Sequence, residues 1–296
     1  MFANCVVPLW PGGSKHPLFL VHGVDGDVAR FENLLPYLAA DQPVYGILAQ
    51  GLLRERVAFT RVEEMARYYV EQIRQGQPHG PYQLAGYSFG GFVAFEMALQ
   101  LRAKGERVGF LGLIDPIPMG GRGKPAGSDL EKPNTAYGGG AFRAHLSRAL
   151  GPNGFDYACS KLTRRLFRLV YTYFDQLKRP IPRVLQSAPD INWFAGRLYR
   201  PGMYAGRVTL FRLSETPKER CFSEEEWSTH AAEGVEVQEL SGSHGNIFYE
   251  PDVRSLAEAL NYCLTAKSRV ETSRPVEQPS SQVEGIRIGD CSCGKH

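Results

Sequence analysis

The residues from Tyr82 to Gly105, YQLAGYSFGGFVAFEMALQLRAKG, decide the fold. The segment YQLAG at residues 82–86 is apolar, short and stopped by glycine, which predicts a buried strand. The segment from Phe92 onward has the pattern of a helix that ends at Gly105, a residue common at helix stops. A strand, a tight glycine turn and a helix in direct succession predict one unit of a parallel sheet covered by helices.

The same alternation continues on both sides of this unit. We expect strands at residues 17–23, 43–47, 108–115, 207–213 and 235–240, and helices at 62–75 and 253–267. This order predicts an α/β fold, with a mainly parallel sheet and helices on both of its faces.

The alternation is interrupted between residues 116 and 204. Residues 119–140 are rich in glycine, proline and charge, and helical patterns follow at 141–150, 156–178 and 190–199. An insertion after a strand belongs at the ligand-binding edge of such a sheet, so we expect a helical lid, with the aromatic residues Phe167, Tyr171, Tyr173 and Phe174 in its core. Residues 1–267 then form one domain, and the polar stretch 268–296 is expected to be a disordered tail. Its terminal CSCGKH lacks the full ligand set of a metal site, so we expect no bound metal.

The composition limits the classes of partner. The chain has 296 residues, 43% of them hydrophobic, and a net charge of +3, which is too small to indicate a nucleic-acid partner. No apolar run approaches the roughly 20 residues that span a bilayer, and the N-terminus lacks the features of a secretory signal. The six cysteines are scattered, which fits thiols in a reducing compartment. We therefore expect a cytoplasmic protein with no membrane partner.

The turn Gly86-Tyr87-Ser88-Phe89-Gly90 matches the G-x-S-x-G nucleophile elbow in the strand–turn–helix context that this motif requires. The turn is so tight that Gly86 and Gly90 cannot carry bulk, and the Ser88 side chain is held above the sheet edge. The alternative is an ordinary strand-to-helix turn in which Ser88 only caps the helix. We favour the elbow, and hence a serine hydrolase of the α/β-hydrolase type with Ser88 as nucleophile.

A serine nucleophile needs a base and an acid to orient that base, and in this fold they follow it along the chain as acid and then histidine. Of the later histidines, His145 falls in the expected lid and His230 in a charged helical stretch, so we choose His244, in a glycine-containing loop after the last strand. The acid has two candidates, each following a strand: Asp115 and Glu215. We favour Asp115 because it follows an apolar strand and because a buried carboxylate needs a partner.

The tetrahedral intermediate needs two N–H donors for its oxyanion. One is the Phe89 N–H, directly after the nucleophile. The other is expected from the loop after the early strand, where Val24 is the candidate. The sequence here is His22-Gly23-Val24 and lacks the HGGG run of many lipases, and we assign His22 a structural part in shaping the loop.

Four segments together resemble the thioesterase domains that end nonribosomal peptide and polyketide synthetases. They are HPLFLVHGVDGDVARFENLLPYLAADQPVYGILAQGL, GPYQLAGYSFGGFVAFEMALQLRAKGERVGFLGLID, YAGRVTLFRL and SGSHGNIFYEPDVRSLAEAL. The form GYSFGG is more similar to these chain-terminating type I domains than to proofreading type II enzymes. In the type I pattern the acid follows the strand after the elbow, which implies Asp115 rather than Glu215. The resemblance then places the triad at Ser88, Asp115 and His244.

The resemblance also implies a reaction. Ser88 would take an acyl chain from the phosphopantetheine thioester of a carrier protein, and water or a nucleophile within the chain would release it; no resident cofactor is implied. The methionine start and the long tail favour a free-standing enzyme. Basic residues over 156–183 could dock an acidic carrier protein, although a solvated helix explains them as well. The alternative hypotheses are a type II editing thioesterase, a small-molecule carboxylesterase and a non-catalytic binding protein.

Overall fold

The sheet has seven strands in the order β1-β3-β2-β4-β5-β6-β7. The computed structural model describes residues 5–52, 59–119, 166–167, 169–177, 179, 181–182, 185–217 and 221–272. The strands are β1 (Val6–Trp10), β2 (Leu18–Val21), β3 (Val44–Ile47), β4 (Tyr82–Tyr87), β5 (Val108–Ile114), β6 (Val208–Leu213) and β7 (Val235–Leu240). Only β1 pairs antiparallel, with β3; the other pairs are parallel. The predicted α/β class is confirmed, and the carboxyl ends of six strands meet at one edge.

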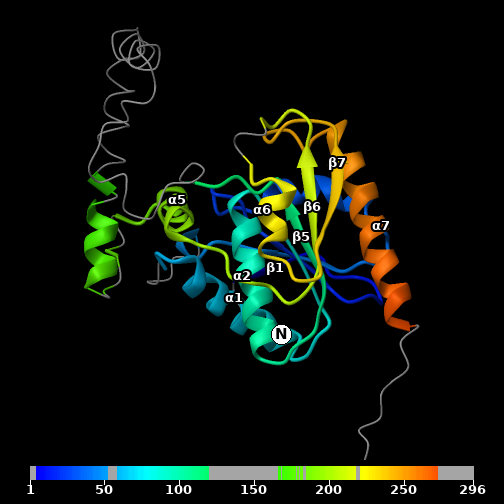
Figure 1. Cartoon of the computed structure of the whole chain (residues 1–296), viewed down its shortest axis with the longest axis horizontal. Helices are drawn as coiled ribbons and strands as arrows, with labels where there is room; N and C mark the ends of the chain where they lie inside the picture. The colour runs from blue at the N-terminus through cyan, green and yellow to red at the C-terminus, as the bar shows by residue number, and fades with distance from the viewer. Residues whose placement is uncertain are drawn as a thin grey trace, which may run out of the picture.

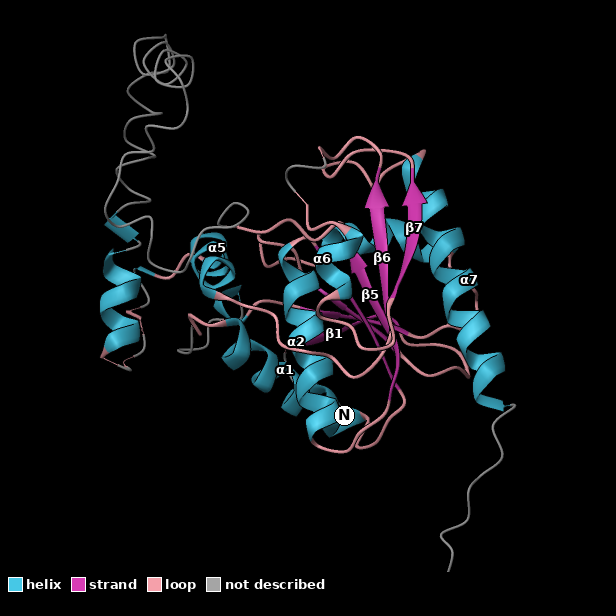
Figure 2. Ribbon diagram, in the orientation of Figure 1, coloured by secondary structure: helices cyan, strands magenta, loops and turns pink. Residues whose placement is uncertain are grey.

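Helices cover both faces of the sheet (Figure 1). The 3-10 helix η1 (Ala29–Tyr37) and α7 (Asp252–Thr272) lie against one face, and α1 (Val62–Gly76), α2 (Phe89–Ala103) and α6 (Glu224–Ser228) against the other. The helix α5 (Ala188–Leu198) packs outside α1 and α2, next to the short 3-10 helix η2 (Gln50–Leu52). Each face therefore has its own apolar core, and Figure 2 shows the helices on either side of the strands.

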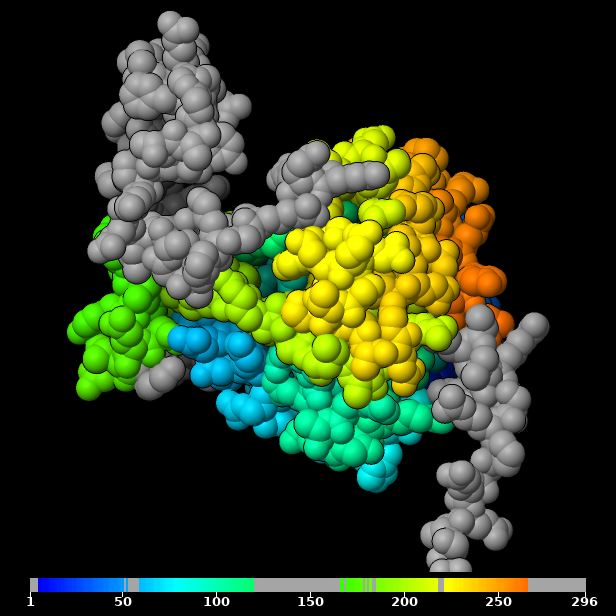
Figure 3. All heavy atoms as spheres, in the orientation of Figure 1, coloured from blue at the N-terminus to red at the C-terminus, as the bar shows by residue number. Residues whose placement is uncertain are grey.

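Aromatic side chains join α6 to α2. The Trp227 ring of α6 is fully buried and stacks on Phe92, with ring centroids 5.8 Å apart, and it also contacts Phe95. The space-filling view looks onto this side, where the yellow residues around α6 pack beside α2 (Figure 3). After α6 the chain returns to β7, and the turn between these two elements carries His230 on this face. The ring of His230 contacts the edge of Trp227 there.

One strand and two helix ends differ most from the sequence prediction. The strand β1 was not predicted, because Pro8 interrupts its pattern; it forms at the edge of the sheet, where a proline costs no ladder bond. The helix α2 begins at Phe89 and not at Phe92, since Gly90 and Gly91 already lie within the helix. The helix α7 runs to Thr272, five residues beyond the predicted end at residue 267.

The expected lid is described only in part. Residues 120–165, including His145, and the tail residues 273–296 lie outside the described residues, as does most of the basic stretch over 156–183. Residues 166–176 are helical where described, and of the four aromatic residues expected to form a lid core, Tyr171 is buried and Phe167 and Phe174 are half-buried. The expectation was wrong for Tyr173, which is 58% exposed because it lies on the outer side of its helix.

Two kinds of feature are absent from the described residues. Among the helices they form, none is long and apolar enough to cross a bilayer. Within the same part of the chain, no group of three or more histidine, cysteine, aspartate or glutamate side chains is arranged to hold a metal ion.

Candidate active site

The turn from β4 to α2 has the geometry of a nucleophile elbow. Ser88 has φ 54° and ψ −119°, a strained conformation for a residue with a side chain. A Cβ atom on Gly86 would lie 2.0 Å from the Gly90 carbonyl oxygen, and one on Gly90 would lie 2.2 Å from that of His22. Both positions therefore require glycine, as the motif predicts.

The structure brings Ser88, His244 and Asp115 into one line of hydrogen bonds. The Ser88 hydroxyl lies 3.0 Å from His244 Nε2, and His244 Nδ1 lies 2.6 Å from Asp115 Oδ2. Because a carboxylate only accepts, Nδ1 carries the ring proton and Nε2 is left to accept from the serine. Three strand ends supply these residues: Ser88 follows β4, Asp115 follows β5, and His244 lies in the loop after β7. This order can activate a hydroxyl as a nucleophile.

Asp115 is a buried carboxylate with several partners. It is 1% exposed, and besides His244 it accepts a hydrogen bond from Thr216 Oγ1 at 2.8 Å and a weak one from Cys221 Sγ at 3.6 Å. The rival acid, Glu215, is exposed to solvent next to Thr216. The turn after β6 thus contributes a threonine that supports the acid, which sequence reasoning missed because no local pattern marks it.

The loop after β2 is held by His22. This ring is fully buried; its Nδ1 lies 2.6 Å from the Gly23 carbonyl oxygen and its Nε2 3.0 Å from the Tyr69 hydroxyl. Since the carbonyl only accepts, Nδ1–H donates to it and Tyr69 donates to Nε2. Burial lowers the pKa of His22 to about 4, against opposing contributions from the Gly23 hydrogen bond and Asp25, so the ring is neutral at pH 7. The structural part assigned to His22 agrees with these contacts.

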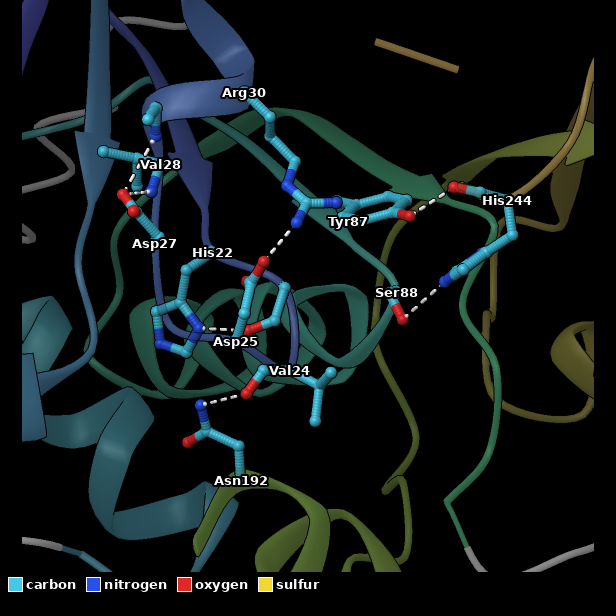
Figure 4. A network of polar contacts seen from close by, with 12 residues as sticks. His22, Val24, Asp25, Asp27, Val28, Arg30, Tyr87, Ser88, Asn192 and His244 are labelled. Carbon is cyan, nitrogen blue, oxygen red and sulfur yellow. Dashed lines mark hydrogen bonds and ion pairs between the residues drawn. The ribbon is translucent and has the colours of Figure 1, made fainter. Parts of the chain in front are cut away.

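These contacts fix the peptide that carries the Val24 N–H. The carbonyl and N–H of a trans peptide point in opposite directions, so holding the Gly23 carbonyl toward His22 aims the Val24 N–H the other way. On its other side, the Val24 carbonyl accepts a hydrogen bond of 3.0 Å from Asn192 Nδ2 of α5 (Figure 4). Asn192 is 2% exposed, and no local sequence pattern indicates this contact.

The second expected donor, the Phe89 N–H, is the first of α2. The first N–H groups of a helix have no partner within it and lie at the positive end of its dipole. The loop that carries Val24 reaches the elbow, since a Cβ on Gly23 would lie 3.1 Å from the Tyr87 ring. The Val24 and Phe89 N–H groups are therefore the candidate donors to an oxyanion.

Comparison with known proteins agrees with the fold and shows the family. Residues 16–262 match the family model described as Thioesterase domain. The chain is 31% identical over 244 residues to malpinin synthetase of Mortierella alpina, covering 81% of this chain and 3% of that protein. It is 45% identical over 117 residues to the nonribosomal peptide synthetase btyA of Aspergillus terreus, covering 39% of this chain and 13% of that protein. The chain thus spans a small fraction of these relatives' length.

Solved structures share the fold. The NocB thioesterase domain from the nocardicin cluster is 24% identical with a TM-score of 0.58, over 88% of this chain and 98% of that one. The four-domain nonribosomal peptide synthetase AB3403 is 23% identical with a TM-score of 0.63, over 88% of this chain and 20% of that one. At this level of identity the likeness shows the α/β-hydrolase architecture.

Proposed function

The chain belongs to the thioesterase domain family, and from this premise we propose that it releases an acyl, peptidyl or polyketide chain from the phosphopantetheine arm of a carrier protein. Ser88 is the proposed nucleophile, His244 the base and Asp115 the acid. The observation that carries this proposal is the line of hydrogen bonds from the Ser88 hydroxyl through the His244 ring to the buried Asp115.

In the proposed first step, Ser88 Oγ attacks the thioester carbon while His244 Nε2 takes the hydroxyl proton. The carbonyl oxygen becomes an oxyanion and accepts hydrogen bonds from the Val24 and Phe89 N–H groups. Asp115 stabilises the imidazolium that forms. When the tetrahedral intermediate collapses, the carbon–sulfur bond breaks, and the thiolate leaves with the proton held by His244, so Ser88 carries the acyl chain as an ester.

In the second step, His244 takes a proton from water or from a hydroxyl or amine of the chain itself. The new nucleophile attacks the ester carbon, and Ser88 Oγ leaves with the proton returned by His244. Water gives a free acid, whereas an internal hydroxyl or amine gives a lactone or lactam. The same three residues serve both steps, because each step needs one proton taken from the attacking group and one given to the leaving group.

Two features support a carrier-bound substrate. The relatives are named as synthetases, and the match to the four-domain nonribosomal peptide synthetase AB3403 covers 20% of that chain. The proposed acid also follows β5, the strand after the elbow, where the type I pattern expects it. A type II editing thioesterase or a small-molecule carboxylesterase with the same triad is the alternative function.

The test compares substrates. An acyl pantetheine thioester or acyl-carrier protein should be turned over with a kcat/KM at least as high as that of simple acyl esters, and Ser88→Ala should abolish both activities. A preference for simple esters by orders of magnitude would favour the carboxylesterase. Failure of a fluorophosphonate to label Ser88 would instead indicate a non-catalytic binding protein.

A further inference from the structure

The residue directly before the nucleophile contacts the proposed base twice. Tyr87 ends β4 and is 3% exposed. Its hydroxyl donates a hydrogen bond to the main-chain carbonyl of His244, and its ring stacks on the imidazole with centroids 4.8 Å apart and planes inclined by 25° (Figure 4). One side chain thus anchors both the backbone and the ring of His244 to the nucleophile elbow.

The other contacts of the imidazole leave one motion open. Its hydrogen bonds to Ser88 and Asp115 lie at two points on the ring edge, and they define an axis about which the ring could still tilt. The His244 side chain is 31% exposed, so solvent rather than protein borders part of the ring. Contact with the face of Tyr87 opposes this tilt.

Arg30 holds Tyr87 in turn. Its guanidinium carbon lies 5.3 Å from the centroid of the Tyr87 ring, and the same group pairs with Asp25 in the loop that also carries Val24. Phe248 packs on Tyr87 edge to face, with centroids 5.0 Å apart. The Tyr87 ring is therefore held by the Arg30 cation and by the edge of the Phe248 ring. These contacts connect the loop that carries Val24, the elbow and the loop that carries His244.

We propose that Tyr87, held by Arg30, is a positioning residue that keeps the His244 ring aligned between Ser88 and Asp115. This inference rests on the proposed catalytic roles of those three residues. The face of Tyr87 is also the negative side of its quadrupole, so it favours the imidazolium that forms when His244 takes the serine proton. Arg30 opposes that charge, but its ion pair with Asp25 reduces its effect.

The experiment measures the rate constant kinact and the half-saturation constant KI for labelling of Ser88 by a fluorophosphonate, which needs no natural substrate. Tyr87→Leu removes both contacts and should lower kinact about 100-fold, as misplacement of a catalytic group does, with KI unchanged. Tyr87→Phe keeps the stack and loses the hydrogen bond, so kinact should fall by a factor of about three to ten. Partial rescue by phenylalanine would separate the two contacts.

Tyr82→Phe is the matched control. Tyr82 lies on the same strand, is fully buried and donates its hydroxyl to the main-chain carbonyl of Gln77 at 2.7 Å, away from the site. Tyr82→Phe should lose about as much stability as Tyr87→Phe and should keep the kinact of the wild type. Equal kinact in Tyr87→Leu and wild type would overturn the positioning role. If Tyr87→Leu does not fold, equal kinact in Tyr87→Phe and Tyr82→Phe would overturn it. No labelling of the wild type would refute the proposed function itself, a distinct outcome.

Discussion

Asp115→Asn should lower kcat by two to four orders of magnitude while the fold is kept. The asparagine is isosteric, and its amide oxygen can accept from His244 Nδ1 and Thr216 as the carboxylate does, at 2.6 Å and 2.8 Å. It cannot supply the negative charge that stabilises the imidazolium. If the amide NH₂ faces Nδ1 instead, the ring proton moves to Nε2, which then cannot accept from Ser88. Because Asp115 is 1% exposed, water screens this charge little.

Loss of the orienting acid lowers kcat by up to about 10⁴ in related triads, which corresponds to roughly 5.5 kcal/mol of activation free energy. The assay follows thiol release from an acyl pantetheine thioester, with the melting temperature as a check on folding. Glu215→Gln is the control. Because Glu215 is exposed, the kcat of this variant should stay within about twofold of the wild type. If Glu215→Gln lost activity and Asp115→Asn did not, the assignment of the acid would be refuted.

Three further changes test the supports of the site. Gly90→Ala places a Cβ 2.2 Å from the His22 carbonyl oxygen and should cost about 3 kcal/mol of unfolding free energy, measured by urea titration. Gly12→Ala, where the nearest atom is 3.9 Å away, should cost less than about 0.5 kcal/mol, and equal losses would contradict the elbow geometry. Asn192→Leu removes the bond to the Val24 carbonyl and should lower kcat/KM by up to about tenfold; an unchanged kcat/KM would show that this bond does not support the oxyanion loop. Because the pKa of His22 is lowered from 6.5 to about 4, the unfolded chain binds the extra proton first as pH falls. Stability should therefore fall by about 3 kcal/mol from pH 7 to 4, and His22→Gln should lack this component; the same pH dependence in both proteins would refute it.

The parts of the fold that the sequence predicts are those with strong local constraints. The elbow is recognisable because backbone contacts of 2.0 Å and 2.2 Å would meet any Cβ at Gly86 and Gly90. The strands β2 to β6 are recognisable because burial on both faces requires short apolar runs. The edge strand β7, VEVQEL, is largely half-buried and has a more polar pattern. The order of the residues along the chain predicted His244 as the base, and the expected burial at the end of an apolar strand predicted Asp115 as the acid.

The remaining contacts depend on residues that meet only after folding. Thr216 and Asn192 bond to Asp115 and Val24 across 101 and 168 positions of sequence, and nothing in their local sequence indicates a partner. Tyr173 was misplaced because an amphipathic helix with aromatic residues on two sides does not reveal which side is covered. The edge strand β1 escaped notice because Pro8 breaks the pattern that identifies strands.

The proposed function requires Ser88 to form an acyl-enzyme with a chain delivered as a thioester. The most direct measurement is the intact mass of the protein after brief exposure to acyl pantetheine thioesters, with peptide mapping of the adduct. We expect a mass increase equal to the acyl group, located on Ser88, absent in Ser88→Ala and longer-lived when deacylation is slow. Turnover of the thioester by a Ser88→Ala protein, or an acyl group found on another residue, would contradict the account.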